Sequence, residues 1–255
     1  MRGTFSNLDG WAAALVAGAC AFAAGAALAD PEPRDQERPY GWREVWTGAD
    51  AASQVWLLYS GATIAPYGHI FSEGLRLRAA GGYGRYSYLG ERRGVPQGFN
   101  AETSYGEALV GYLKQFGPLT AKAFVGVTAI RHDVTPFDPD NPVQGQEVGP
   151  KIATEFWLNI GSSAWASLDA SWTSAHGTAA ARTRFGYRIW KDASLGLEGG
   201  INANDLGEDA RAGVFARYAW NGGEISVSGG YSGRFLEEAE QLRDPYATLN
   251  WLTQF

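Results

Sequence analysis

The sequence predicts an all-β protein, a single outer-membrane antiparallel β-barrel of about twelve strands with a narrow, charged lumen. Three observations lead to this prediction. Short segments with one polar and one apolar face recur along the chain, roughly every ten to fifteen residues. Tight turns alternate with longer connections between these segments. The last segment ends on an aromatic residue, Phe255.

The composition suits one β-rich domain. The 255 residues include 34 Gly, 10 Trp and 12 Tyr, and their formal net charge of −6 does not indicate a nucleic-acid partner. After residue 30 no apolar run approaches the roughly 18 to 20 residues of a membrane-spanning helix. A membrane location therefore requires a barrel, with outer-membrane lipid as its partner. No motif indicates a cofactor, a metal cluster or a nucleotide.

The N-terminal residues predict export. Residues 11–28 are nearly all Ala, Leu, Val, Gly and Phe and lead into an Ala-Leu-Ala sequence. This pattern predicts a secretory signal peptide over residues 1–29, and an anchor helix is the less favoured alternative. Polar, Pro-rich residues 30–42 are expected to form a periplasmic segment with little structure, and residues 43–255 to form the barrel. Cleavage removes Cys20, so we expect no disulfide.

The last ten residues have the period of two that is typical of a strand. Ala247, Leu249, Trp251 and Thr253 lie on a mostly apolar face that ends at Phe255, and the other face is mostly polar. Such a strand can pair with the first strand of a barrel and remove both sheet edges. We expect Phe255 to face lipid at this closing seam and Gln254 to face the lumen.

Twelve segments are expected to be strands, and the first two are also compatible with one long bent strand. They are Arg43–Asp50, Gln54–Ile64, Ser72–Tyr88, Ala101–Gln115, Leu119–Arg131, Val148–Ile160, Ala164–Thr173, Thr178–Ile189, Ala193–Ala203, Asp209–Trp220, Glu224–Tyr231 and Tyr246–Phe255.

The connections predict the orientation, because bacterial barrels place tight turns on the periplasmic side and longer loops outside. Tight turns are expected at residues 116–118, 161–163, 191–192 and 221–223. Outer connections are expected at residues 90–100, 132–147, 174–177, 205–208 and 232–244. With twelve strands, both ends of the barrel chain fall on the periplasmic side.

Charged residues alternate with apolar ones along Ala179–Ile189. A charge on the lipid face costs roughly 2–4 kcal/mol at the membrane midplane, so its arginines are expected inside. A soluble sandwich would solvate the same face, but Trp190, Tyr218, Trp220 and Trp251 fall where an aromatic girdle is expected.

The same alternation, continued around the barrel, predicts a set of lumen-lining side chains. They are Arg76, Arg78, Glu107, Lys122, Lys151, Glu155, Trp157, Asp169, Arg182, Arg184, Arg188, Glu198, Arg211, Arg217 and Glu224. Arg184 and Glu198 are expected to lie nearly opposite each other and to brace the lumen. Twelve strands fall between filled eight-stranded barrels and open porins, which favours a narrow or occluded bore.

The connection after residue 132 offers Asp133, Asp138, Asp140 and Asn141 as oxygen ligands for calcium. The order of these residues lacks the glycine and distal glutamate of an EF-hand loop. Asp, Asn and Pro are also ordinary turn residues. We therefore favour a rigid outer loop over a cation site.

Two catalytic arrangements compete with a non-catalytic barrel. Ser174, His176 and Asp169 are near enough in sequence for a hydrolase triad, although neighbouring loop residues rarely achieve its geometry. Glu155 and Asp169, on adjacent strands, could act as paired carboxylates on a sugar. Ion pairing with Arg184 and Lys151 is the favoured alternative.

Three luminal aromatic residues are candidates for stacking on a glycan: Phe124, Trp157 and Phe215. Large aromatic side chains that face the lumen can bind a sugar in this way. More commonly, however, such residues fill the space of a narrow lumen.

The segment Pro136–Gly145, with its Asp-Pro-Asp-Asn-Pro-Val sequence, together with Val148–Lys151 and Glu155–Asn159, resembles the bacterial cellulose biosynthesis protein BcsS family. Residues 74–78, 81–84 and 184–188 agree with it, and the likeness covers about residues 45–255. The resemblance implies an outer-membrane barrel that accompanies cellulose synthase components, without an assigned active site.

The resulting hypothesis is a non-catalytic accessory protein that assists export or assembly of cellulose. The alternatives are a barrel that anchors the polymer at the surface and, less favoured, an outer-membrane hydrolase centred on His176. The expected partners are lipid, cellulose and cellulose synthase components.

Overall fold

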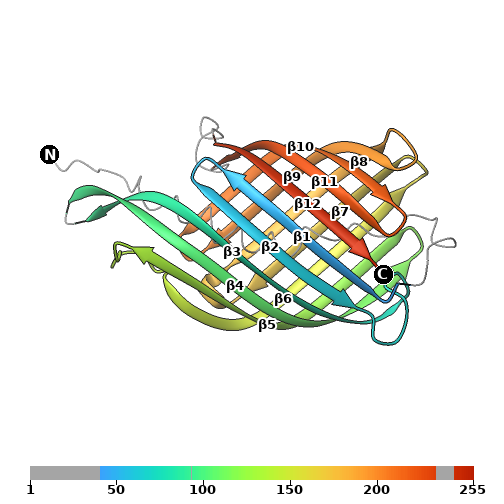
Figure 1. Ribbon diagram of the computed structural model, residues 1–255, viewed down its shortest axis with the longest axis horizontal. Coiled ribbons are helices and arrows are strands. Elements are labelled where there is room, and N and C mark those ends of the chain that lie inside the picture. Colours follow the sequence, from blue (N-terminus) through green and yellow to red (C-terminus); the bar gives the residue numbers. More distant parts are fainter. Residues whose placement is uncertain (1–40, 93, 234–243) are drawn as a thin grey trace.

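The computed structural model describes residues 41–92, 94–233 and 244–255, which form one closed antiparallel barrel of twelve strands (Figure 1). The predicted signal peptide and residues 30–40 lie outside the described residues. Consecutive strands pair around the wall, and β1 pairs with β12. The strands are β1 Arg43–Ala52, β2 Val55–Ile64, β3 Gly74–Arg92, β4 Val95–Phe116, β5 Leu119–Thr135, β6 Gly145–Ile160, β7 Ala164–Thr173, β8 Ala179–Arg188, β9 Ala193–Asn204, β10 Gly207–Trp220, β11 Gly223–Gly233 and β12 Asp244–Gln254. A short 3₁₀ turn, η2 Ala175–Gly177, follows β7.

Arg43 and Phe255 extend the seam between β1 and β12 to one end of the barrel. The two residues exchange backbone hydrogen bonds of 3.2 and 3.0 Å, and the Arg43 guanidinium carbon lies 4.2 Å from the centroid of the Phe255 ring. We call this end the C-terminal rim and the other the distal rim. Phe255 is 46% exposed, and Trp251 is also exposed. The predicted pleat of the last strand is confirmed.

Twelve strands are confirmed, and β1 and β2 are two separate strands. The predicted outer connection at residues 90–100 is wrong, because β3 and β4 pair continuously to Arg92 and Val95. The predicted connections at 132–147 and 205–208 are likewise shortened by longer strands. Residues 234–243 of the predicted last connection lie outside the described residues.

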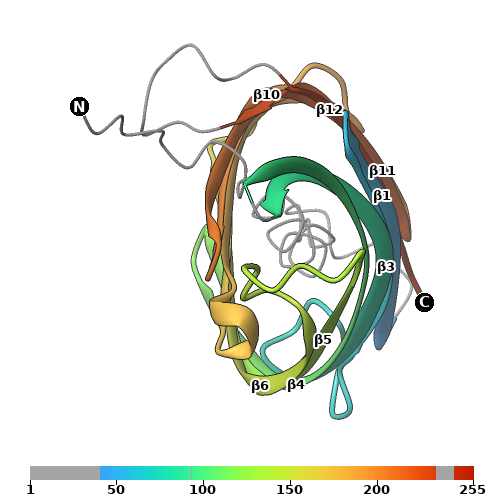
Figure 2. The same ribbon diagram turned by 90° about the vertical axis from the view of Figure 1, so that its left-hand side faces the viewer.

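The long strands β3 to β6 continue past the rest of the wall at the distal rim. They have 19, 22, 17 and 16 residues, whereas a transmembrane strand needs about 9–11. Pairing of β2 with β3 stops at Tyr86, and the Ser87 N–H donates to the Gln54 carbonyl. From Tyr88 to Arg92 the strand pairs with β4. Tyr86, Tyr88, Phe99 and Ala101 form a buried cluster on this extension. Figure 2 looks into this rim and shows the end of β3 curving across the opening.

The two faces of the wall differ as the alternation predicts. Large apolar side chains are exposed on the outward face, and charged or polar ones are buried on the inward face. Exposed aromatic side chains mark the C-terminal rim, among them Tyr187, Trp190, Tyr218 and Trp251. Among the described residues, no helix is long and apolar enough to cross a membrane.

Inward glycines make room for the large aromatic side chains of neighbouring strands. A Cβ atom on Gly186 would lie 2.3 Å from Cε2 of Trp165, and one on Gly61 would lie 2.4 Å from Cζ2 of Trp46. Each tryptophan is fully buried, so its rigid ring has no free space to move into. Glycine at these positions allows bulky side chains to lie flat against the inner wall.

We expect Gly186→Ala to lower the thermal unfolding temperature of the detergent-purified barrel, because Trp165 would have to leave its stack. The matched control is Gly106→Ala, since a Cβ atom there meets no heavy atom within 4 Å. The loss of heat-modifiable migration in gels measures the transition. Equal unfolding temperatures for the two variants would contradict this account of the inner wall.

We also expect Phe255→Asp to impair membrane insertion far more than Gln254→Asp, because it puts a carboxylate on the outward face beside the seam. The amount of folded barrel recovered from outer membranes measures insertion. Similar recovery of both variants would mean that the two faces of β12 tolerate charge equally.

Candidate functional site

The barrel interior holds a balanced set of buried charges. On the described strands eight basic side chains and eight acidic side chains are buried. The basic ones are Arg76, Arg78, Lys122, Lys151, Arg182, Arg184, Arg211 and Arg217. The acidic ones are Glu44, Asp50, Glu107, Glu155, Asp169, Glu198, Asp209 and Glu224. Burying isolated charges is very unfavourable, so the arrangement of partners decides whether this interior is stable.

Most of the predicted lumen-lining residues are in this buried set, and Trp157 is buried as well. Arg188 is only half-buried at the C-terminal rim, where it donates hydrogen bonds to Asn159 and to the Ser162 carbonyl. The prediction missed Glu44, Asp50 and Asp209. The alternation of inward-facing and outward-facing residues along β1 and β10 would have placed these three side chains in the lumen.

Glu198 is paired with Arg182, although Arg184 is its backbone partner. The register places Arg184 opposite Glu198, as expected. The Arg182 Nη2 atom, however, lies 2.5 Å from Glu198 Oε2, and the Tyr246 hydroxyl donates to Glu198 Oε1 at 2.7 Å. Long side chains on twisted sheets reach diagonal neighbours, and Gly200 opposite Arg182 leaves that path open. The short ion pair of Glu198 is therefore with Arg182, whereas the sequence predicted Arg184 as its partner.

Arg184 and Asp169 form a looser pair on the neighbouring strands β8 and β7. Their closest nitrogen and oxygen atoms are 4.0 Å apart. The Arg184 guanidinium carbon also lies 5.9 Å from the centroid of the Phe215 ring.

Other pairs join strands that are not neighbours in the wall. Arg211 on β10 lies 2.8 Å from Asp50 on β1, and Thr248 donates to the same Asp50 oxygen at 3.1 Å. Lys151 on β6 lies 2.5 Å from Glu107 on β4. Such contacts span one or two intervening strands, so these side chains extend into the bore rather than along the wall.

Glu155 has two basic partners, so the predicted carboxylate pair is not left free to act on a sugar. Its Oε1 atom lies 2.6 Å from Arg78, and Oε2 lies 3.8 Å from Lys122. Asp169 lies directly opposite Glu155 in the register. The expected ion pair of Arg184 with a carboxylate is present, whereas Lys151 takes Glu107 rather than Glu155.

A stack of aromatic rings fills the interior near the C-terminal rim. Trp157 and Trp165 are stacked with centroids 4.2 Å apart, and Phe215 lies 5.3 Å from Trp165. Arg217 lies over both indole rings and donates two hydrogen bonds to Glu224. Because these rings are buried against one another, packing is the role that the contacts support. Phe124 is covered in the same way by Arg78, 3.7 Å from its centroid.

Arg76 organises the connection between β2 and β3 rather than the bore. Its guanidinium donates to the backbone carbonyls of His69, Ile70, Ser72 and Leu75. This is a correction to its predicted lumen-lining role, and the reason is that Arg76 lies at the strand end nearest this connection. Buried Ala65, Ile70 and Phe71 form a small core inside the same connection.

The connection between β5 and β6 is folded inward at the distal rim, and its predicted ligands are used as turn residues. Asp138 accepts hydrogen bonds from the Asp140 backbone and from the Tyr88 hydroxyl at 2.7 Å. Asn141 donates to Tyr88 and accepts from the Val143 backbone. Asp133 is exposed and paired with Arg131. Asp138 and Asn141 therefore fasten the connection to Tyr88.

The predicted hydrolase triad is not assembled. Neither ring nitrogen of His176 has a hydrogen-bond partner, so neither Ser174 nor Asp169 is hydrogen-bonded to it. Asp169 lies lower in the wall, where its nearest cation is Arg184. The side chains needed for proton transfer to a serine are therefore apart.

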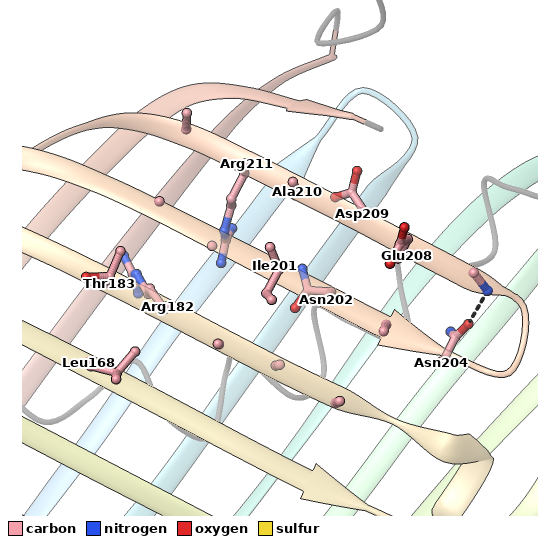
Figure 3. Close-up of a pocket in the computed structure, with 18 residues that line it drawn as sticks. Leu168, Arg182, Thr183, Ile201, Asn202, Asn204, Glu208, Asp209, Ala210 and Arg211 are labelled. Carbon is pink, nitrogen blue, oxygen red and sulfur yellow. Dashed lines mark hydrogen bonds between the residues drawn. The ribbon is translucent and has the colours of Figure 1, made fainter. Parts of the chain in front are cut away.

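A pocket of about 1110 Å³ lies along β7 to β10 (Figure 3). Its lining combines outward-facing Leu168 and Ile201 with Arg182 and Arg211, whose guanidinium groups are engaged by Glu198 and Asp50. Most other lining residues are alanine or glycine. No histidine or serine is among the described residues that line it, so it does not supply the groups that the hydrolase hypothesis needs.

We expect Arg182→Ala and Glu198→Ala each to destabilise the barrel by roughly 3–5 kcal/mol, because each leaves a buried charge without its partner. The double variant should recover part of this loss, since neither charge remains. Urea unfolding of the detergent-solubilised barrel measures the three free energies. Arg188→Ala at the rim is the control and should change stability little. Additive effects of the two single variants would contradict the pairing.

Comparisons with known proteins agree with this architecture. Comparison with curated protein sequences finds no match. The "KdgM porin in complex with disordered oligogalacturonate" is similar at a TM-score of 0.52 and 11% identity, covering 83% of this chain and 99% of that one. The "TodX deltaS2S3 mutant monoaromatic hydrocarbon channel" is similar at 0.52 and 8% identity, covering 85% and 90%. An outer membrane channel from Pseudomonas putida F1 has a TM-score of 0.48 and 13% identity, covering 89% and 100%.

At such identities, the first two likenesses establish the fold alone, that of channel and porin barrels. The sequence of the barrel carries the family relationship. A family model described as cellulose biosynthesis protein BcsS matches residues 45–255, which run from β1 to the last residue of the closing seam. The chain therefore belongs to the cellulose biosynthesis protein BcsS family.

Proposed function

We propose that this protein is a non-catalytic outer-membrane accessory of cellulose biosynthesis that assists export or assembly of the polymer. The observation that carries the proposal is the family match over the whole barrel, residues 45–255. The barrel fold supports a location in lipid, because a closed sheet satisfies every strand's backbone where water is absent. The periplasmic side would be the C-terminal rim.

The charge balance of the interior supports an uncharged cargo. Rings of one charge sign select ions of the opposite sign in channels. Apart from Arg76, which holds the β2–β3 connection, seven buried basic and eight buried acidic side chains face the bore. Such a lumen has little net attraction for an anionic polymer, and cellulose, a neutral glucan, fits it better.

Contacts at the distal rim support a barrel that is closed at rest. Tyr88 fastens the β5–β6 connection through Asp138 and Asn141, and its ring stacks on Phe99 with centroids 5.1 Å apart. Ion pairs such as that of Arg211 with Asp50 narrow the bore below. Passage of a polymer would require these contacts to break. The extension at the distal rim would therefore act as a gate.

Surface anchoring is the second candidate, and a specific feature favours it. The extension of β3 to β6 exposes Leu89, Val95, Phe137 and Val148 beyond the length of a transmembrane strand. Apolar and aromatic groups of this kind can contact a glucan chain outside the membrane. Export and anchoring predict different defects, so they can be separated by fractionation.

We expect a strain that lacks the protein to secrete less cellulose, while the intracellular supply of precursor is unchanged.

We expect Tyr88→Phe to raise the single-channel conductance of the purified barrel. The substitution removes the hydroxyl that holds Asp138 and Asn141 but keeps the ring on Phe99. Tyr83→Phe, on the outward face, is the matched control.

A strain that secretes a normal amount of cellulose but retains less of it on the cell surface would contradict export and support anchoring. High conductance of the wild-type barrel, unaffected by Tyr88→Phe, would contradict the closed resting state.

A further inference from the structure

Two of the three histidines in the sequence meet at the distal rim. His132, near the end of β5, and His176, in the η2 turn, have ring centroids 5.1 Å apart and an interplanar angle of 78°. Both side chains are buried. His132 Nε2 and both ring nitrogens of His176 have no hydrogen-bond partner in this position. Buried polar atoms are normally paired, so this concentration of unpaired imidazole nitrogens calls for an explanation.

Glu147, near the start of β6, supplies an oxygen beside these rings. Its Oε2 atom accepts a hydrogen bond of 2.6 Å from the His176 backbone N–H. Its Oε1 atom lies 3.6 Å from His176 Nδ1, and the side chain is 48% exposed. The backbone contact therefore holds the carboxylate in place while the second oxygen stays next to an imidazole nitrogen and within reach of solvent.

Two of the separations are close to those around a tetrahedral metal ion. With metal–ligand bonds of about 2.0–2.1 Å, two ligand atoms lie about 3.3 Å apart and two imidazole centroids about 5 Å apart. The corresponding distances here are 3.6 and 5.1 Å. The Tyr86 hydroxyl lies 3.3 Å from His132 Nδ1, which orients that ring and leaves Nε2 for a ligand.

The backbone of His176 also marks this turn as unusual. Its φ of 50° and ψ of 29° lie in the left-handed region, which non-glycine residues rarely adopt. Such strain persists only where surrounding contacts hold it, and it is concentrated at functional sites. Here the Glu147 carboxylate accepts a hydrogen bond from the His176 N–H, and the Asp205 N–H donates one to the His176 carbonyl.

We propose that His132, His176 and Glu147 form a binding site for Zn²⁺ or a similar late first-row divalent ion, with water as the remaining ligand. Among the residues that the structure describes, no group of three His, Cys, Asp or Glu side chains is placed to hold a metal ion as it stands. Binding therefore requires these side chains to move. Imidazole and carboxylate are suitable ligands for these ions. The bound ion would join β5, β6 and η2 at the distal rim, a role separate from any transport of cellulose.

The test uses the full barrel, purified without a histidine tag, stripped with EDTA and titrated with Zn²⁺ by calorimetry. We expect one Zn²⁺ per barrel, and an unfolding temperature that rises with the Zn²⁺ concentration because the ion binds only the folded rim. His132→Gln and His176→Asn should each weaken binding at least tenfold. Asparagine tolerates the left-handed backbone of residue 176 and so keeps the turn. The control is His69→Asn, near the C-terminal rim, which should bind as the wild type does.

Absence of stoichiometric Zn²⁺ binding by the wild type would overturn the proposal, and so would equal binding by the variant that lacks both His132 and His176. Should these variants fail to fold, X-ray absorption of the Zn²⁺-loaded wild type decides. Scattering from two imidazole ligands supports the site, and a zinc shell without imidazole rejects it. Neither result depends on cellulose export, so failure here leaves the proposed function standing.

Discussion

Pairing of β1 with β12 is the constraint on which the rest of the structure depends. In lipid, water cannot satisfy the N–H and C=O groups of an open sheet edge, so a spanning sheet has to close on itself. The seam pairs residues Glu44–Ala52 with residues Gln254–Tyr246 in unbroken register. Arg43 and Phe255 extend it by a further pair of backbone hydrogen bonds. Closure fixes which side chains face inward, because the pleat can no longer shift by one residue.

Charges placed inside by this closure have to find partners inside. Diagonal and cross-bore pairs meet that requirement, as with Arg182 and Glu198 or Arg211 and Asp50. The similar numbers of buried basic and acidic side chains that face the bore leave the interior nearly neutral. Bulky rings share the same space because inward glycines such as Gly186 lie beneath them. A braced, neutral interior is compatible with a neutral polymer and with a bore that is narrow at rest.

The two rims of the barrel differ in construction. At the C-terminal rim, Arg76 donates hydrogen bonds to carbonyl groups of the β2–β3 connection. Exposed aromatic residues surround the wall at the same rim. At the distal rim, strands longer than a membrane requires curve over the opening and bring Tyr88 to the β5–β6 connection. The same end gathers His132, His176 and Glu147. Contacts that can open or be joined by an ion are thus concentrated on one side of the molecule.

The sequence by itself determined the fold class, the twelve strands and the direction of most side chains. Alternation along Ala179–Ile189 is a local property, and a charge cannot face lipid without a large cost, so Arg182 and Arg184 could be placed inside without a structure. The family likeness also rested on contiguous residues, and the family match over residues 45–255 agrees with it.

Only the tertiary structure decided which groups meet. Arg184 is opposite Glu198 in the register. The twist of the sheet and the open space at Gly200 nevertheless allow Arg182 to form the short ion pair with Glu198. The segment 90–100 is polar and rich in glycine, which favours a loop, but burial of Tyr88 and Phe99 over the opening makes it a hairpin. His132 and His176 are 44 positions apart in sequence and come together only through strand pairing. Such contacts depend on strand stagger and side-chain reach across the bore, and neither quantity is contained in local periodicity.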